Sequence, residues 1–207
     1  MNKSEGKKTQ VIGLTGEPCC GKTTIAGLFK RRGAYIIDAD QVYHRLIRPG
    51  QALYKRLIAK FGQAILFKGR IDRKKLGALA FANPRQLKAL TRLTHPVILA
   101  CLQKELQAAR GLGKSLVVID APLLIETGLH KKVDIVIVVK TSRLRLIQRC
   151  RKLRGLKRAV ITNRIKSQLP LNNKIRLADY VIENNGTIAD TNKQVRELLG
   201  ALAHKRN

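Results

Sequence analysis

The stretch that decides the fold is Gly16-Glu17-Pro18-Cys19-Cys20-Gly21-Lys22-Thr23. It matches the phosphate-binding pattern G-x-x-x-x-G-K-S/T at every fixed position. The apolar run 11–14 before it is typical of a buried strand, and the apolar pattern over 24–29 after it indicates a helix. A strand, a glycine loop and a helix in this order are the context that the motif requires.

The residue types of this loop predict how it holds a polyphosphate. Gly16 and Gly21 let the backbone turn so that several N–H groups point inward, and the helix that follows adds the positive end of its dipole. Lys22 is expected to reach the β- and γ-phosphates, and the Thr23 hydroxyl to bind Mg²⁺. The alternative is a chance match on a glycine-rich turn. We expect an ATP site made by Gly16, Cys19, Cys20, Gly21, Lys22, Thr23 and Thr24.

Length and charge bound the possible functions. A chain of 207 residues with 44% apolar residues suits one domain with an inserted subdomain. Its formal net charge of +29 indicates polyanionic partners such as nucleotides, nucleic acid or acidic surfaces. The basic residues are spread along the chain, so a generally basic solvated surface is an equally good explanation.

The cysteines and the N-terminus predict the compartment. Cys19, Cys20, Cys101 and Cys150 form no C-x-x-C pair and no zinc spacing with histidine, which indicates reduced thiols in a cytosol. Residues 1–8 lack the apolar stretch of a signal peptide. No apolar run approaches the ~20 residues of a membrane helix. We therefore expect a cytoplasmic protein without a membrane segment.

Apolar runs that alternate with helical patterns predict an α/β fold. The expected strands lie near 10–14, 34–37, 115–120, 133–139 and 180–182. Such alternation favours a P-loop NTPase-like parallel five-stranded sheet flanked by helices. The expected parts are a flexible tail at 1–9, a nucleotide-binding core at 10–40, 113–142 and 169–207, a helical insertion at 41–112 and a basic helical lid at 143–168.

The insertion shows helical signals in series and no strand signal. Helices are expected over 41–47, 53–61 and 73–81, then from Pro84 to Leu93, and from His95-Pro96 to about Arg110. Thr187 and Asp190 resemble a capping pair for a last helix that ends near Ala203.

Three carboxylates follow expected strands. Asp120 ends an apolar strand, where a carboxylate of phosphate-loop proteins holds Mg²⁺ or its water; capping a helix is the alternative, and both can hold at once. Asp38 and Asp40 follow the second strand, at the sheet edge where the phosphate loop is also expected. A kinase gains from a carboxylate there that accepts the proton of the acceptor hydroxyl. The alternative role of Asp38 and Asp40 is to stabilise a turn or cap a helix.

The basic segment suggests a lid. Arg151, Arg154 and Arg158 share one helical face, and a mobile basic hairpin over ATP would neutralise developing charge and exclude water. A solvated basic face is the alternative for most of these side chains. His95 before Pro96 is more typical of a helix start than of a catalyst. The N–H groups of the loop would favour a lowered thiol pKa at its two cysteines, without a catalytic role.

Several ordered motifs together resemble the dephospho-coenzyme A kinase family over nearly all of residues 10–200. They are Val11-Ile12-Gly13-Leu14-Thr15-Gly16, Ile37-Asp38-Ala39-Asp40, Ile71-Asp72-Arg73 with Leu76-Gly77, His95-Pro96, Asp120-Ala121-Pro122-Leu123-Leu124 with Glu126, Gln148 with Arg151 and Arg154, Arg164 with Gln168, and Ala178-Asp179-Tyr180-Val181-Ile182 through Asn184 and Gly186.

The resemblance implies the reaction and the roles of the residues. ATP would phosphorylate the ribose 3′-hydroxyl of dephospho-CoA to give CoA and ADP, the last step of coenzyme A synthesis. Asp40 matches the general base, Lys22 and Thr23 the phosphate and Mg²⁺ contacts, and Arg151 the lid arginine. The insertion would be the acceptor domain, and Asn184 and Gly186 would lie where the family holds adenine. The implied acceptor-site residues are Asp38, Arg73, His95, Pro122, Leu123 and Leu124.

The loop departs from the family pattern, which usually reads Gly-Gly-Ile-Gly-Ser-Gly-Lys. Glu17 adds a negative charge beside the phosphates, and Pro18 removes a backbone donor, so we expect weaker ATP binding. The lid is also one residue shorter than the family's between Gln148 and Arg154, which leaves Arg149 as the alternative to Arg151.

Two other functions are compatible with parts of the sequence. The charge of +29 suits a nucleic-acid-binding or regulatory nucleotide-binding protein, but only 4% of residues are aromatic and no nucleic-acid-binding motif is visible. We therefore do not expect nucleic acid as a partner. A kinase of the same fold acting on a nucleoside or nucleoside monophosphate is the other alternative. The sequence does not decide the oligomeric state.

Overall fold

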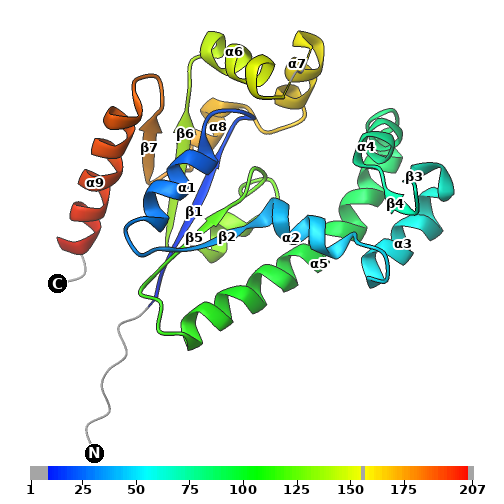
Figure 1. Ribbon diagram of the computed structural model, residues 1–207, viewed down its shortest axis with the longest axis horizontal. Helices are drawn as coiled ribbons and strands as arrows, with labels where there is room; N and C mark the ends of the chain where they lie inside the picture. The colour runs from blue at the N-terminus through cyan, green and yellow to red at the C-terminus, as the bar shows by residue number, and fades with distance from the viewer. Residues whose placement is uncertain (1–8, 155–156, 205–207) are drawn as a thin grey trace, which may run out of the picture. The chain divides into compact units, whose positions relative to one another are not determined.

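The computed structural model describes residues 9–154 and 157–204 (Figure 1). They form two compact units: the chain up to Ile37 together with the chain from Ala108 onward, and the segment Asp38–Gln107 between them. The expected tail at 1–9 lies, except for Thr9, outside the described residues. Within the described residues, no helix combines the length and apolar character needed to cross a bilayer.

A five-stranded sheet confirms the predicted α/β fold. Its strands lie in the order β2 (Tyr35–Asp38), β5 (Leu116–Asp120), β1 (Gln10–Gly16), β6 (Ile135–Lys140) and β7 (Tyr180–Glu183). β1 pairs in parallel with both β5 and β6, and β6 pairs in parallel with β7. The register places Gly16 opposite Val139. The glycine loop therefore leaves the sheet at the carboxyl edge of its central strands, where this fold class binds ligands.

Burial explains why the strand sequences are almost continuously apolar. Ile12 and Leu14 of β1 and Ile137 of β6 are fully buried in one core cluster. The helices α1 (Lys22–Lys30) and α9 (Ile188–His204) complete this cluster with Phe29 and Val195, among others, and pack on each other (Figure 1). A sheet covered on both faces requires such apolar runs. The strand before the glycine loop, β1, and the helix after it, α1, are thus anchored in the same core.

Smaller elements surround the sheet. A 3₁₀ turn, η2 (Leu129–Lys132), precedes β6, and α8 (Leu171–Arg176) lies beside β6. The basic segment forms α6 (Arg143–Arg154) and α7 (Arg158–Lys166), as predicted for 143–168, with residues 155–156 outside the described part. Leu146, Cys150 and Ile161 are buried between these two helices.

The second unit is mainly helical, but it contains a hairpin that the sequence analysis missed. Its helices are α2 (Ala39–Leu46), α3 (Ala52–Phe61), α4 (Arg73–Phe81) and most of α5 (Pro84–Gly111), with a 3₁₀ turn η1 (Gln63–Ile65). β3 (Leu66–Phe67) and β4 (Arg70–Ile71) pair antiparallel across Lys68-Gly69. Both turn residues have positive φ, 47° and 71°, which suits a two-residue hairpin turn. Strands of two residues are too short to show alternation.

The prediction of separate helices before and after His95-Pro96 was wrong, since α5 runs unbroken through Pro96. Leu90, Leu93 and Val97 pack on one core cluster from both sides of the proline. A proline inside a helix loses one backbone hydrogen bond and crowds the preceding turn. Here the shared apolar stripe outweighs that local cost.

Candidate active site

Close packing at two positions explains the glycines of the loop. Gly16 has φ +153°, and a Cβ there would lie 2.6 Å from the Val139 carbonyl oxygen. Gly21 has φ +97°, and a Cβ there would lie 2.1 Å from Asn184 Nδ2. Because α1 starts at Lys22, directly after Gly21, the N–H groups of its first turn face the loop's opening as an anion site requires. The sequence-predicted phosphate loop therefore has the expected local geometry.

Three side chains from outside the loop hold the Cys20 carbonyl oxygen in place. It accepts hydrogen bonds from Asn184 Nδ2 at 2.8 Å, Thr141 Oγ1 at 3.0 Å and Arg149 Nη1 at 3.4 Å. Asn184 is buried, and its Oδ1 in turn accepts from Thr191 Oγ1 at 3.0 Å. The amide of Asn184, expected near adenine, is therefore engaged in holding the phosphate loop.

The side chains at the mouth of the loop differ in exposure. Thr23 and Thr24 are exposed, Lys22 is half-buried, and Asp120 is buried at the end of β5. Burial raises the pKa of the Cys20 thiol, the charge of Lys22 opposes this, and the charge of Asp120 adds to it. The expected lowered thiol pKa is thus wrong for Cys20, because its side chain is buried beneath the loop.

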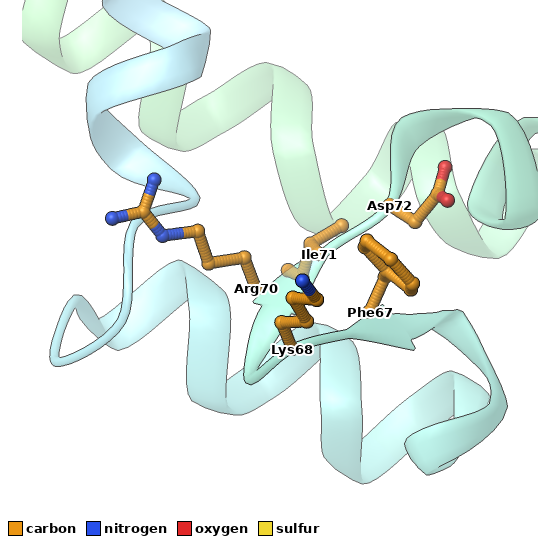
Figure 2. A pocket seen from close by; sticks show the side chains of 5 residues that line it. All are labelled: Phe67, Lys68, Arg70, Ile71 and Asp72. Carbon is orange, nitrogen blue, oxygen red and sulfur yellow. The ribbon is translucent and has the colours of Figure 1, made fainter.

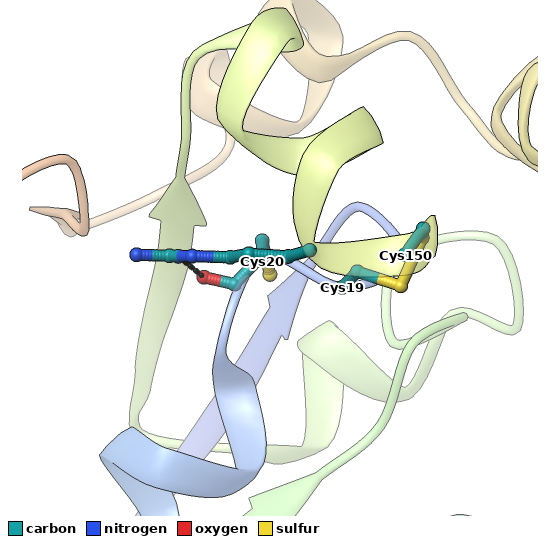
Figure 3. The surroundings of a disulfide bond; sticks show 4 residues. Cys19, Cys20 and Cys150 are labelled. Carbon is teal, nitrogen blue, oxygen red and sulfur yellow. Dashed lines mark hydrogen bonds between the residues drawn. A yellow bond between two sulfur atoms is a disulfide. The ribbon is translucent and has the colours of Figure 1, made fainter. Parts of the chain in front are cut away.

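A disulfide joins Cys19 of the loop to Cys150 of α6 (Figure 3). The prediction of four reduced thiols is therefore wrong for this pair, while Cys20 and Cys101 are free thiols. The two bonded cysteines are 131 residues apart and belong to no short motif, so sequence spacing gave no sign of the pair. Only the fold brings α6 onto the loop.

Glu17 is a carboxylate inside the phosphate loop. Burial raises its pKa, and the charges of Arg143 and Lys174 oppose that rise. The nearest ion-pair contact is to Arg143 Nη1 at 3.9 Å. The negative charge expected from the sequence is thus partly offset by basic side chains from α6 and α8.

A buried lysine organises the loop after β5. Lys174 of α8 is fully buried, and its Nζ donates to the Pro122 carbonyl and to Gln168 Oε1, both at 3.0 Å. It also pairs with Glu126 at 2.9 Å. The Thr15 hydroxyl donates to the same Pro122 carbonyl at 3.1 Å. The backbone at Pro122 is therefore fixed from β1 and from α8, a role of Lys174 that the sequence analysis did not single out.

The two leucines that follow Pro122 differ in their exposure to solvent. Leu123 is exposed, whereas Leu124 is fully buried and packs against Gly13, where a Cβ would lie 2.6 Å from a Leu124 methyl. Leu124 is therefore a core residue.

Gly186 packs closely on Asp190, which forms the expected capping pair with Thr187.

The two lid arginines occupy different places. Arg149 reaches the Cys20 carbonyl, whereas the exposed Arg151 lines a hollow of about 450 Å³ on α6 and α7. The other lining residues are Leu144, Ile147, Gln148, Lys152 and Arg158. Arg151 is thus available to an external ligand, and Arg149 is engaged with the loop backbone.

The remaining predicted site residues lie in the second unit. Asp38 caps α2 by accepting a hydrogen bond from the Gln41 N–H at 3.0 Å, and Asp40 is exposed in the first turn. One turn later, His44 contacts the Arg73 guanidinium. Burial and the charge of Arg73 lower the pKa of His44, against the charges of Asp40 and Asp38. His44 was not singled out from the sequence, where only its i, i+4 spacing from Asp40 could have indicated it.

The second unit also contains His95 and a hollow at its hairpin. His95 is half-buried within α5, and burial lowers its pKa. A hollow of about 350 Å³ lies at the hairpin, and Figure 2 shows Arg70 extending away from the side chains of Phe67 and Asp72. Its lining residues are Phe67, Lys68, Arg70, Ile71 and Asp72. None of the sequence-predicted site residues lines it.

Two oxygen-bearing side chains near the loop would suit a metal ion that binds together with a nucleotide. The described part of the chain has no cluster of three or more His, Cys, Asp or Glu side chains placed to hold a metal ion. Mg²⁺ in phosphate-transfer sites usually takes one or two protein oxygens and completes its shell with phosphate and water. The exposed Thr23 hydroxyl and the Asp120 carboxylate fit such a site.

Comparisons with known proteins agree in both sequence and structure. A family model described as dephospho-CoA kinase matches residues 10–190. A dephospho-CoA kinase of Aquifex aeolicus is 38% identical over 190 residues, which cover 90% of this chain and 94% of the relative. The Thermus thermophilus protein TT1252 has a crystal structure that matches with a TM-score of 0.80 at 31% identity, covering 95% and 99% of the two chains. A dephospho-CoA kinase of Campylobacter jejuni matches with a TM-score of 0.70 at 25% identity over 97% and 100%.

Proposed function

The chain belongs to the dephospho-CoA kinase family, and from this premise we propose how its residues divide the work. Members use ATP as the phosphoryl donor and catalyse the last step of coenzyme A synthesis. The proposed reaction transfers the γ-phosphoryl group to the ribose 3′-hydroxyl of dephospho-CoA and releases ADP. The observation that carries it is the loop 16–23, tightly packed at both glycines within a chain matched by the family along most of its length.

The first unit is the proposed donor site. The N–H groups of the loop and of the first turn of α1 bind the β- and γ-phosphates, and the half-buried Lys22 adds a positive charge. Thr23 and Asp120 would hold Mg²⁺ together with the nucleotide. When bound, Mg²⁺ neutralises charge on the phosphate oxygens.

The second unit is the proposed acceptor domain, corresponding to the insertion expected at 41–112. Asp40, exposed in the first turn of α2, would accept the proton of the 3′-hydroxyl. Asp38 fixes the start of α2 by capping it. Arg73 and His95 in this unit, and Pro122 and Leu123 in the first, are the proposed contacts to dephospho-CoA.

The helices α6 and α7 are the proposed lid. Arg151 is exposed and would contribute positive charge to the transferred group, while Arg149 keeps the loop in place. We further propose that the enzyme works in the cytoplasm and that its basic surface serves nucleotide chemistry rather than nucleic-acid binding.

One assay tests the reaction. ADP release by the purified protein is measured with ATP and Mg²⁺ and with dephospho-CoA, with AMP or nucleosides, and with no acceptor. Release only with dephospho-CoA, with the phosphate placed on the ribose 3′-oxygen by NMR, is the expected result. Equal release with another acceptor would contradict it.

Substitution of Asp40 tests the proposed base. Asp40→Asn is expected to lower kcat by ~10²–10⁴ with little change in the ATP dissociation constant. Glu197→Gln removes an exposed carboxylate of α9 that has no part in the proposed site, and it serves as the matched control. An Asp40→Asn enzyme as fast as this control would exclude Asp40 as the base.

A further inference from the structure

The disulfide connects two functional segments within the first unit. Cys19 belongs to the phosphate loop and is half-buried, whereas Cys150 belongs to the basic helix α6 and is fully buried (Figure 3). Cys19 also has a positive φ of 61°, which is uncommon for a residue other than glycine. The covalent bond therefore ties a constrained position of the loop to the helix that carries Arg149 and Arg151.

The polar contacts that the described residues of α6 make with the loop are long. Arg149 donates to the Cys20 carbonyl at 3.4 Å, and Arg143 lies 3.9 Å from Glu17 with nearly half of its side chain exposed. The Glu17 side chain is mostly buried, but at 3.9 Å the two charged groups are too far apart for a direct hydrogen bond, so this contact holds α6 only weakly. Among the side chains that the structure describes, the buried members of the apolar cluster under α6 and α7 are Leu146, Cys150 and Ile161. The disulfide is therefore the strongest described link that holds α6 on the loop.

A disulfide at this place has a chemical consequence. In the reducing compartment proposed for the enzyme, disulfides that do form are mostly transient, catalytic or redox-sensing. We propose that Cys19 and Cys150 are a reversible thiol–disulfide modification site, whose reactants are low-molecular-weight thiols and disulfides, and that closing the bond tightens nucleotide binding. The proposal rests on the assignment of the loop to ATP.

The exchange is balanced by two thiol molecules. The thiolate of the first attacks the Cys19 sulfur, the more accessible one, so the Cys19–Cys150 bond breaks and Cys150 leaves as a thiolate that takes up a proton. The second thiolate attacks the outer sulfur of the mixed disulfide and releases Cys19 as a thiol. The two external thiols are oxidised to one disulfide, and the protein gains two thiols. Coenzyme A, the family's product, is itself a thiol of this class.

Preorganisation links the bond to affinity. With the bond closed, the loop and α6 are already ordered before the nucleotide arrives. With the bond open, nucleotide binding must itself order these segments, which weakens the observed affinity. Coupling between two such events typically changes affinity 5-fold or more. We therefore expect the reduced protein to bind ATP and ADP at least ~5-fold more weakly.

The test is nucleotide binding across a series of glutathione redox buffers. Calorimetry gives the ADP dissociation constant, and mass spectrometry after alkylation gives the state of the bond. The expected result is a dissociation constant that rises about 5-fold or more as the bond opens and returns when it closes. Binding is measured without dephospho-CoA, so a wrong acceptor assignment leaves this readout untouched.

Three variants make the outcome specific. Cys150→Ala and Cys19→Ser should bind ADP as weakly as the reduced protein and should not respond to glutathione. Cys101→Ser, which removes a free thiol in the second unit, should respond like the original protein. The proposal is overturned if the dissociation constant is the same with the bond open and closed, if the bond never forms in the buffer series, or if Cys150→Ala still responds.

Discussion

Replacing Lys174 by methionine tests whether the buried ammonium organises the segment after β5. Methionine keeps a long side chain of similar shape, so the change removes the charge and three donors without opening a large void. In the native protein, Nζ satisfies the Pro122 carbonyl, Gln168 Oε1 and Glu126 at 2.9–3.0 Å. After the substitution, the Glu126 carboxylate keeps its charge and its hydrogen bond from the Leu169 N–H at 2.9 Å, but it loses its ion-pair partner.

The expected cost follows from this change. Removing one partner of a buried ion pair costs ~3–5 kcal/mol. The Glu126 side chain is 20% exposed, so water can replace part of the lost interaction. The Pro122 carbonyl keeps its bond from Thr15. The lower end, about 3 kcal/mol, is therefore expected, which corresponds to a fall in Tm of ~6–12 °C for a chain of this size.

Urea unfolding and thermal melts followed by circular dichroism measure this cost. Lys193→Met removes an exposed lysine of α9 and should change the free energy of unfolding by less than ~0.5 kcal/mol. Adding Glu126→Gln to Lys174→Met removes the stranded charge and should recover part of the loss. A Lys174→Met protein as stable as Lys193→Met, or a double variant less stable than the single one, would refute this account of the segment.

Three further changes probe the loop. Asn184→Ala should lower the free energy of unfolding by about 1–3 kcal/mol and raise the KM for ATP, because the buried Cys20 carbonyl loses its shortest hydrogen bond. The control is Asn192→Ala, which removes an amide whose hydrogen bond from Arg32 is exposed to solvent, and equal effects of the two substitutions would contradict the role of Asn184. Burial raises the pKa of Glu17, so the fold favours its neutral form: this stability is fully present below the unfolded pKa of about 4.5 and is lost as pH rises through the folded pKa. Glu17→Gln should therefore be more stable than the original protein at pH 7, with an advantage that shrinks toward pH 4.5, and a pH-independent difference in urea midpoint would count against it. Reducing the disulfide should lower the free energy of unfolding by ~2–4 kcal/mol, since it closes a loop spanning 131 residues, and a Cys150→Ala protein should show no such reductant effect in the same urea titration.

The sheet and the phosphate loop could be predicted because local patterns determine them. Continuous apolar runs mark strands buried on both faces: Val11 and Ile12 of β1 are neighbours whose side chains point to opposite faces, and both are buried. The fixed glycines mark positions where a Cβ would overlap Val139 or Asn184. The family resemblance, now supported by a family model over residues 10–190, added the reaction.

The rest depends on contacts between distant segments. The Cys19–Cys150 bond and the Asn184–Cys20 hydrogen bond join residues 131 and 164 positions apart, and neither leaves a pattern in the sequence. The unbroken helix α5 was missed because a local rule about Pro96 was outweighed by packing on both sides of it. Tertiary packing routinely overrides local propensity in this way.

The contacts from outside the loop also bear on its unusual composition. Pro18 has no N–H to donate to a phosphate, and Glu17 places a carboxyl group near the site. Both changes weaken the loop's own attraction for an anion. The loop is instead held by three donors on the Cys20 carbonyl and by the bond from Cys19 to α6. Because a preformed loop loses less entropy when the nucleotide binds, rigidity supplied by α6 and by the residues that follow β6 and β7 can offset the missing donor. The nucleotide affinity of this kinase should consequently depend on side chains outside the phosphate loop, of which Asn184 is the most directly testable.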